Sequence, residues 1–363
     1  MVFSSVIFLF IFLPCLLIFY YNPFFKSRRF KNALLLLASL AFYAWLETLF
    51  VFVMILSIVI NYFLVLLMNK CGDENRRKRK IILGVSVGWN ILLLFGFKYL
   101  GFFVNNFSAV FPSLGLPRLE IALPIGISFF TFQIMSYCFD VYYKKACAQK
   151  NIFDLALYIS LFPQLVAGPI VRYSSIENQI KNRTENLNDF TNGLKRFVIG
   201  LSKKCILADS VALICDNILS LSIPNLSCAL SWLGALSYSL QIYFDFSGYS
   251  DMAIGLGKMF GFDFEENFNY PYMAKSVTDF WRRWHISLST WFRDYVYIPL
   301  GGNRCSKARW IFNMFIVWAF TGIWHGANWT FWFWGVYYFV LLIFEKSKLM
   351  DNLLSKKPFA LLW

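Results

Sequence analysis

Residues 48–69 read TLFVFVMILSIVINYFLVLLMN, an apolar run without a charged side chain. About 20 apolar residues form a helix long enough to cross the hydrocarbon core of a bilayer. Similar runs occupy residues 3–22, 81–104, 121–143, 205–223 and 227–246. The shorter run 33–46 pairs with 48–69 as a hairpin around Glu47, and the run from Trp310 to Phe344 suits two short crossings. These runs predict an all-α polytopic membrane protein with about nine transmembrane helices.

Composition supports this fold class and excludes a water-soluble chain. Of the 363 residues, 58% are hydrophobic and 15% are charged, whereas soluble domains usually carry about 25% charged residues. Lys and Arg number 34 against 20 Asp and Glu, which gives a net charge of +14. A basic chain can bind nucleic acid, but in so apolar a chain the cations are expected in cytoplasmic loops beside the lipid bilayer. No nucleic-acid partner is predicted.

The basic clusters also orient the chain. Those at 26–31, 70–80 and 144–150 all fall on one side of the predicted spans, and the positive-inside rule makes that side the cytoplasm. The N-terminus is then outside and the C-terminus inside. Residues 152–170 lie between two basic loops and are predicted to form a re-entrant or interfacial helix. Without an internal repeat or a composition shift, residues 1–363 are expected to form a single integral membrane domain.

Histidine occurs only at positions 285 and 325, so any imidazole chemistry must use His285 or His325. His325 lies in the motif Trp324-His325-Gly326, at the break between two apolar helices of half length. An ionisable group within a membrane is a functional hypothesis by default, and an imidazole suits proton transfer near neutral pH. The alternative is a neutral imidazole that only hydrogen-bonds a carbonyl group.

A second polar stretch runs from Asp279 to Asn303 and contains His285. On one helix, residues 281, 284, 288 and 291 (three Trp and one Leu) would form an apolar stripe with His285 beside it. Arg282 and Arg283 could pair with Asp279 or bind phosphate groups. An interfacial helix with an aromatic belt explains the Trp and Arg residues without any function.

The third polar stretch, Gln241 to Asp251, is interpreted as the end of the span 227–246. Asp245, Ser247 and Tyr249 are candidate residues for the wall of a substrate cavity. The alternative is a helix terminus with local side-chain hydrogen bonds and with close packing at the small residues Gly255, Gly257 and Gly261. None of the eight cysteines forms a C-x-x-C pair, so the sequence predicts neither a metal site nor a disulfide framework.

At these residues the chain resembles the membrane-bound O-acyltransferase family. The likeness is greatest to the bacterial branch that acts in alginate O-acetylation, and it extends to the branch of teichoic acid D-alanylation. It covers most of residues 121–335 in order, and the family-like core is expected at about 121–344. The matching segments are Leu123–Ser128, Pro163–Ile170, Asp245–Asp251, Asn267–Tyr272, Asp279–Asn303 and Trp324–Gly326.

The resemblance implies a ring of helices around a tunnel in the bacterial inner membrane, and acyl transfer from a cytoplasmic thioester to a hydroxyl group on the far side. His325 matches the family's catalytic histidine, and His285 matches a position that other members fill with His or Asn. Fewer residues follow His325 than in relatives of this branch, which predicts a shortened C-terminal end.

Residues and resemblance together lead to one hypothesis. His325 is a general base on an acceptor hydroxyl, and His285 positions the thioester or donates a hydrogen bond to its oxygen. Arg282, Arg283 and Asn303 bind the donor, which is acetyl-CoA or another acyl thioester, with no bound cofactor. The acceptor is an extracytoplasmic polysaccharide or an acyl-relay partner protein. The alternatives are a polytopic transporter or flippase, and a non-catalytic scaffold for exopolysaccharide export.

Overall fold

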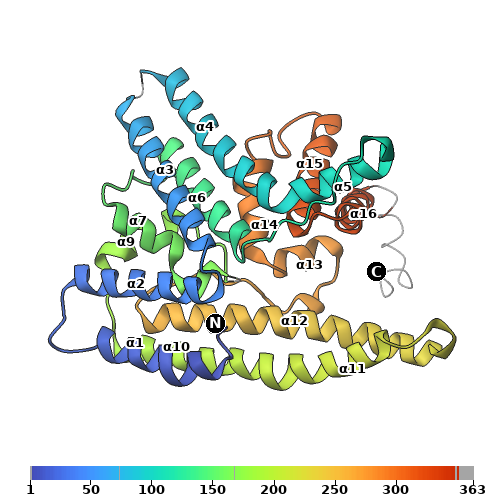
Figure 1. Cartoon of the computed structure of the whole chain (residues 1–363), viewed down its shortest axis with the longest axis horizontal. Helices are drawn as coiled ribbons and strands as arrows, with labels where there is room; N and C mark the ends of the chain where they lie inside the picture. The colour runs from blue at the N-terminus through green and yellow to red at the C-terminus, as the bar shows by residue number, and fades with distance from the viewer. Residues whose placement is uncertain (1, 73, 167, 348–349, 351–363) are drawn as a thin grey trace. The chain divides into compact units, whose positions relative to one another are not determined.

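The computed structural model describes residues 2–72, 74–166, 168–347 and 350 (Figure 1). Every regular element within these residues is a helix, and no strand occurs among them, which confirms the predicted all-α class. The chain divides into two compact units. The first consists of Met1–Tyr62 and Gln149–Glu266, and the second of Phe63–Ala148 and Asn267–Trp363. The candidate histidines both belong to the second unit.

Polar side chains cap the N-termini of several helices of the first unit. Ser27, Asn186 and Ser227 each accept a hydrogen bond from a backbone N–H in the first turn of the helix that follows, as capping residues do. Its helices are η1 and α1 (Phe8–Phe12 and Leu13–Tyr20), α2 (Arg28–Leu46), the start of α3 (Phe50–Lys70), α7 (Ile152–Ser160), α8 (Phe162–Leu165), α9 (Tyr173–Asn182), α10 (Leu187–Ser202), η4 (Lys203–Ala208), α11 (Asp209–Leu219) and α12 (Cys228–Met259).

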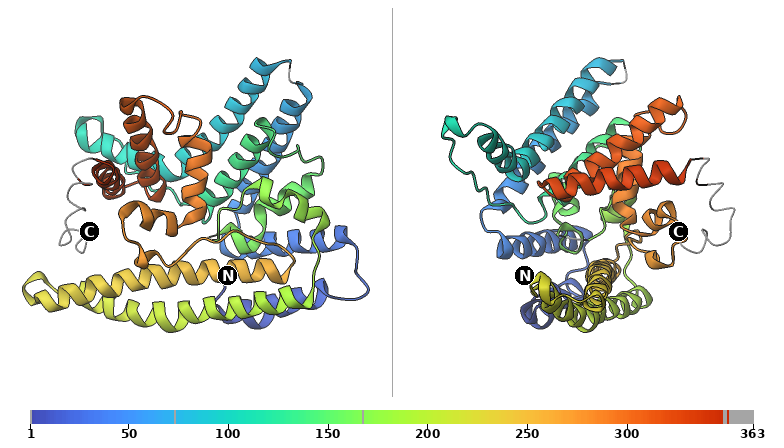
Figure 2. Two further views of the ribbon diagram at one scale, coloured as in Figure 1. Left: turned by 180° about the vertical axis from the view of Figure 1, so that it is seen from behind. Right: turned by 90° about the vertical axis from the view of Figure 1, so that its right-hand side faces the viewer.

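Helix α12 lies antiparallel to the continuous rod α10–η4–α11, as two views show (Figures 1 and 2). Two levels of glycine bring the backbones together: Gly193 meets Gly255, and Gly200 meets Gly248. Such small residues allow close helix packing within membranes. The helix terminus weighed for residues 241–251 is wrong, because α12 continues to Met259; where the membrane span ends stays a prediction. No proline interrupts α12, and its glycines serve packing rather than termination.

The second unit contains the end of α3, the long helix Arg76–Val110, several shorter helices and the hairpin of α15 and α16. Its elements are α4, η2 and α5 (Arg76–Leu94, Phe95–Tyr99 and Leu100–Val110), α6 (Ile127–Tyr142), α13 (Val277–Arg283), α14 (Ile286–Phe292), η7 (Arg293–Tyr297), α15 (Lys307–His325) and α16 (Trp329–Glu345). The predicted span 121–143 is shortened at its start, because Gly126 has a left-handed backbone (φ 77°) and helix α6 begins only after it.

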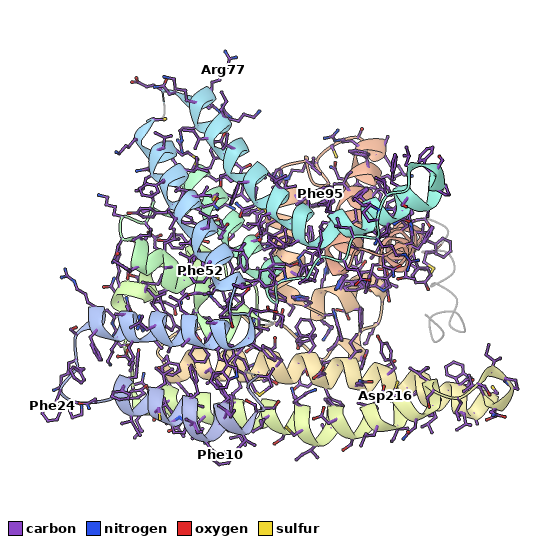
Figure 3. The ribbon with its side chains drawn as sticks, viewed as in Figure 1. Phe10, Phe24, Phe52, Arg77, Phe95 and Asp216 are labelled. Atoms are coloured by element: carbon purple, nitrogen blue, oxygen red, sulfur yellow. The ribbon has the colours of Figure 1, made fainter. Side chains whose placement is uncertain are left out.

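Long apolar helices and outward apolar side chains agree with a membrane environment. Among the described residues, α3 and the continuous helix Arg76–Val110 are long and apolar enough to cross a membrane. Figure 3 shows Phe10 pointing away from the ribbon, and Phe10 and Phe52 are 73% and 66% exposed. Arg77 stands at the outer end of α4 in the same view. The count of about nine crossings stays a prediction.

Candidate functional site

His325 is the last residue of α15, and the chain turns there into α16. The turn is short because Asn328 caps α16, its side chain accepting a hydrogen bond from Thr330 N. A Cβ atom at position 326 would lie 2.5 Å from the Phe331 ring, so a larger residue here would require that ring to shift. The predicted break between two apolar helices, with His325 in it, is therefore confirmed.

Aromatic rings surround the half-buried His325 imidazole. The ring of Trp334 lies 4.9 Å away in an edge-on arrangement, and that of Trp324 lies 5.0 Å away. No hydrogen bond to the imidazole is found among the residues that the structure describes, so the carbonyl partner weighed as an alternative is not seen there. The imidazole instead lines an open cavity.

His285 lies between α13 and α14 rather than within one helix. Its backbone is left-handed (φ 45°, ψ 56°), a conformation that a helix interior excludes. The prediction of a continuous helix carrying a stripe of three Trp and one Leu is therefore wrong. Helix α14 is fixed instead by Trp291, which stacks on Phe132 of α6 at 3.9 Å and donates a hydrogen bond to its carbonyl at 3.1 Å.

The His285 side chain is buried, with 2% exposure, and its Nδ1 lies 3.1 Å from Oδ1 of Asn267. The same Oδ1 accepts hydrogen bonds from the backbone N–H of Ser287 at 3.2 Å and from its hydroxyl at 2.9 Å. A backbone N–H can only donate, so the atom facing it is the amide oxygen. The neutral imidazole therefore carries its proton on Nδ1, and Nε2 is the basic nitrogen.

Both histidines line one cavity of about 740 Å³. Trp324 links them, since its ring lies 6.0 Å from that of His285 and 5.0 Å from that of His325. Trp281 of α13 forms another wall and packs edge-on against Trp318 of α15 at 4.9 Å. The charged and amide side chains of the lining are Arg282, Arg293, Asn303, Lys307 and Lys346. The cavity thus joins an imidazole pair to a basic rim.

Four predicted site residues come together in this cavity: His285, His325, Arg282 and Asn303. Arg283 is engaged elsewhere, because its Nε lies 2.8 Å from Oδ1 of Asp279. The hydrogen bond from Arg283 lowers the pKa of Asp279. Of the two arginines that were expected to pair with Asp279 or to bind phosphate, Arg283 thus pairs with Asp279.

Asp245, Ser247 and Tyr249 belong to the first unit, on α12. Asp245 pairs with Lys204 at 2.7 Å. Tyr249 stacks on Phe3 with ring centroids 4.6 Å apart, and Ser247 is buried. Their role as substrate-binding residues stays a prediction. In the described residues no three His, Cys, Asp or Glu side chains gather where they could hold a metal ion.

The sequence left two groups of residues at the site without a role. Asn267 orients His285, although the two are 18 positions apart. Lys98 and Tyr99 of η2 hydrogen-bond to the carbonyl groups of Trp324 and Ile323, just before His325. The signal for Lys98 was present, because it is a cation inside the predicted span 81–104. Lys98 also lines a second cavity, of about 710 Å³, together with Asn105, Asn106, Glu120 and Ala327.

Comparison with known proteins supports the resemblance. Residues 130–359 match the model of the MBOAT, membrane-bound O-acyltransferase family. A probable alginate O-acetylase AlgI of Pseudomonas syringae pv. tomato is 46% identical over 351 residues, which cover 96% of this chain and 66% of that protein. The peptidoglycan O-acetyltransferase of Helicobacter pylori is 38% identical over 376 residues, 96% of this chain and 71% of that protein.

A more distant relative is the teichoic acid D-alanyltransferase of Bacillus subtilis, 29% identical over 280 residues, which cover 69% of each chain. The chain spans about two thirds of the length of the alginate relative from P. syringae. The family model covers the cavity, both histidines and the α15–α16 hairpin. The chain belongs to the membrane-bound O-acyltransferase family.

Proposed function

We propose that this protein is a membrane O-acyltransferase that transfers an acetyl group from a thioester to a hydroxyl group of an extracytoplasmic polysaccharide. The observation that carries the proposal is the convergence of His285 and His325 on one cavity with a basic rim. The names of the relatives support it, since they are an alginate O-acetylase, a peptidoglycan O-acetyltransferase and a teichoic acid D-alanyltransferase.

In the proposed reaction His325 is the general base. Its imidazole takes the proton of the acceptor hydroxyl while the hydroxyl oxygen attacks the thioester carbonyl carbon. A new C–O bond forms, the C–S bond breaks, and the leaving thiolate takes up the proton. A positioned base contributes about 10²- to 10⁴-fold in rate, and alignment of the two substrates in the cavity supplies a further share.

His285 is proposed to position the donor. With its proton on Nδ1 facing Asn267, the neutral ring has an acceptor, not a donor, at Nε2. It therefore suits an N–H group of the donor better than a developing oxyanion. The tautomer thus favours positioning over the oxyanion role that the sequence left open for this residue.

The donor is proposed to be acetyl-CoA or another acyl thioester, held by its phosphate groups. Arg282, Lys307 and Lys346 lie on the rim of the cavity, and Asn303 adds an amide. Guanidinium and ammonium groups form strong hydrogen bonds with phosphate. The acceptor hydroxyl belongs to the polysaccharide itself or to a partner protein that relays the acyl group, and we propose that it enters by the cavity beside Lys98 and Ala327.

The remaining expectations on architecture are part of the same proposal. The chain is a single multi-pass domain in a bacterial inner membrane, with its N-terminus outside and its C-terminus inside. About nine crossings and further re-entrant helices form a ring around a tunnel, which would let the thioester and the hydroxyl meet at His325 from opposite sides.

The test is acyl transfer by purified protein in lipid vesicles, with acetyl-CoA labelled in the acetyl group and an alginate-type glycan with its partner proteins. His325→Gln should lower transfer by about 10²-fold or more, while Cys147→Ser, an exposed position, serves as the control. Full transfer by His325→Gln would refute the role of this residue. Movement of glycan across the vesicle without loss of acetyl-CoA would instead indicate a transporter.

A further inference from the structure

Two consecutive side chains of η2 bind two consecutive carbonyl groups at the end of α15. The Lys98 ammonium donates to the carbonyl oxygen of Trp324 and, at 3.1 Å, to the Ser128 hydroxyl. The Tyr99 hydroxyl donates to the carbonyl oxygen of Ile323 at 2.9 Å. We propose that Lys98, supported by Tyr99, is a positioning residue that fixes the backbone from which His325 projects. This inference rests on the proposed function.

The end of α15 needs such partners. The last four carbonyl groups of an α-helix accept no hydrogen bond from within the helix. Helix α15 ends at His325. Ile323 and Trp324 are two of these four. A cation at this end also interacts favourably with the helix dipole. Lys98 and Tyr99 therefore supply from a distant part of the chain what a C-terminal cap usually supplies locally.

The location of Lys98 argues against a chance contact. It lies within Arg76–Val110, one of the two helices in the described part of the chain that are apolar and long enough to cross a membrane. A charged side chain there is unfavourable unless it finds partners. The ammonium finds the carbonyl group, the Ser128 hydroxyl and the face of the Trp324 ring, whose centroid is 5.5 Å away. Two of these three partners belong to Trp324, the residue before His325.

The local backbone brings both side chains to the same neighbour. Residues 95–99 form a π-helical turn inside the long helix. A π turn is wider than an α turn, so successive side chains diverge less, and such turns are frequent at functional sites. The result is a pair of donors aimed at adjacent carbonyl groups. Without them the last turn of α15 would fray, and a displacement of about 1 Å at a catalytic group can lower the rate about 10²-fold.

The experiment compares three variants with a control. Lys98→Met keeps the length of the side chain and removes its donors, Lys98→Arg keeps a cation, and Tyr99→Phe removes one hydroxyl. Lys80→Met, at an exposed position of α4, is the matched control. We expect Lys98→Met to lower kcat about 10- to 100-fold with the KM for the donor within about threefold. Lys98→Arg should recover most of kcat, and Tyr99→Phe should lower it less.

A second measurement does not depend on activity. Amide hydrogen exchange over residues 320–328 should be faster in Lys98→Met and in Tyr99→Phe than in the wild type and Lys80→Met. Unchanged exchange with unchanged kcat overturns the inference, as does an effect confined to KM. If the wild type transfers no acyl group, the proposed function fails, and the exchange rates still decide whether Lys98 holds the end of α15. If Lys98→Met does not fold, Lys98→Arg and Tyr99→Phe give the same comparison.

Discussion

Replacing a glycine by alanine is expected to lower the stability of the protein where α10 and α12 are in close contact, and to raise it where the glycine faces open space. A Cβ atom added at Gly255 would lie 2.6 Å from the carbonyl oxygen of Gly193 and 2.7 Å from the amide nitrogen of Phe197. Real Cβ atoms do not approach other heavy atoms closer than 3.0 Å. Both opposing atoms belong to the backbone and cannot rotate away, so in Gly255→Ala the helices must move apart by several tenths of an ångström.

The size of the effect follows from two opposing contributions. Overpacking costs about 1–3 kcal/mol, while replacing glycine by alanine in a helix contributes about 1 kcal/mol of stability. The net expectation for Gly255→Ala is a loss of up to about 2 kcal/mol. Gly88 of α4 has no atom within 4 Å of an added Cβ, so Gly88→Ala shows the helix preference alone and should stabilise the protein by about 0.5–1 kcal/mol.

Thermal unfolding of the detergent-solubilised protein, followed by circular dichroism, measures both variants. The midpoint should fall by a few degrees in Gly255→Ala and rise by about 1–4 °C in Gly88→Ala. Gly200→Ala, at the second level, should behave like Gly255→Ala because its Cβ would lie 2.5 Å from the carbonyl oxygen of Gly248. An increase of the midpoint in Gly255→Ala equal to that in Gly88→Ala would refute close backbone packing of these helices.

Three further predictions concern charge and backbone. Burial alone would raise the pKa of Glu185, but hydrogen bonds and the charge of Arg28 outweigh it and lower this pKa to about 2. The pairing therefore stabilises the fold above the unfolded pKa of about 4.5, and this contribution is lost as pH falls towards 2. Glu185→Gln should be less stable than the wild type by about 1–3 kcal/mol at pH 7, and the difference in unfolding midpoint should shrink below pH 4.5. Arg282→Gln should raise the donor KM about 10-fold through loss of a charge-assisted hydrogen bond, whereas Arg283→Gln should leave the donor KM unchanged and lower only the unfolding midpoint; equal donor KM values would argue against a binding role for Arg282. His285→Ala forces a left-handed alanine and should be less stable than His285→Asn by about 1 kcal/mol, which denaturant titration of the two variants checks; equal stability would contradict the backbone argument.

Much of the fold could be predicted from hydrophobic runs, because a helix can be recognised from its own residues alone. The bounds of α2 and α3 agree approximately with the predicted hairpin segments 33–46 and 48–69. The break at His325 also falls where it was expected. The end of α12 could not be predicted in the same way. Its glycines suggest close packing, but their partners Gly193 and Gly200 lie in another helix and are known only from the structure.

Contacts between residues far apart in the sequence limit the prediction of the site even more than that of the fold. Both histidines could be chosen because they are the only two, and the arginine pairing could be weighed because Asp279 and Arg283 are four residues apart on a helix. The role of Lys98 depends on a contact with Trp324 across more than 200 positions. No local periodicity of the sequence predicts a contact between residues so far apart. It follows from tertiary packing, which places an unsatisfied helix end beside an unsatisfied cation.

The left-handed backbone at position 285 also bears on how this site can change over time. His and Asn are among the few residues other than glycine that adopt that conformation readily, and the family resemblance implies that both occur there. Their codons differ by one base, so a gene can pass from one to the other in a single step. Neither end of that step strains the chain, and the turn between α13 and α14 persists while the chemistry of the side chain is exchanged.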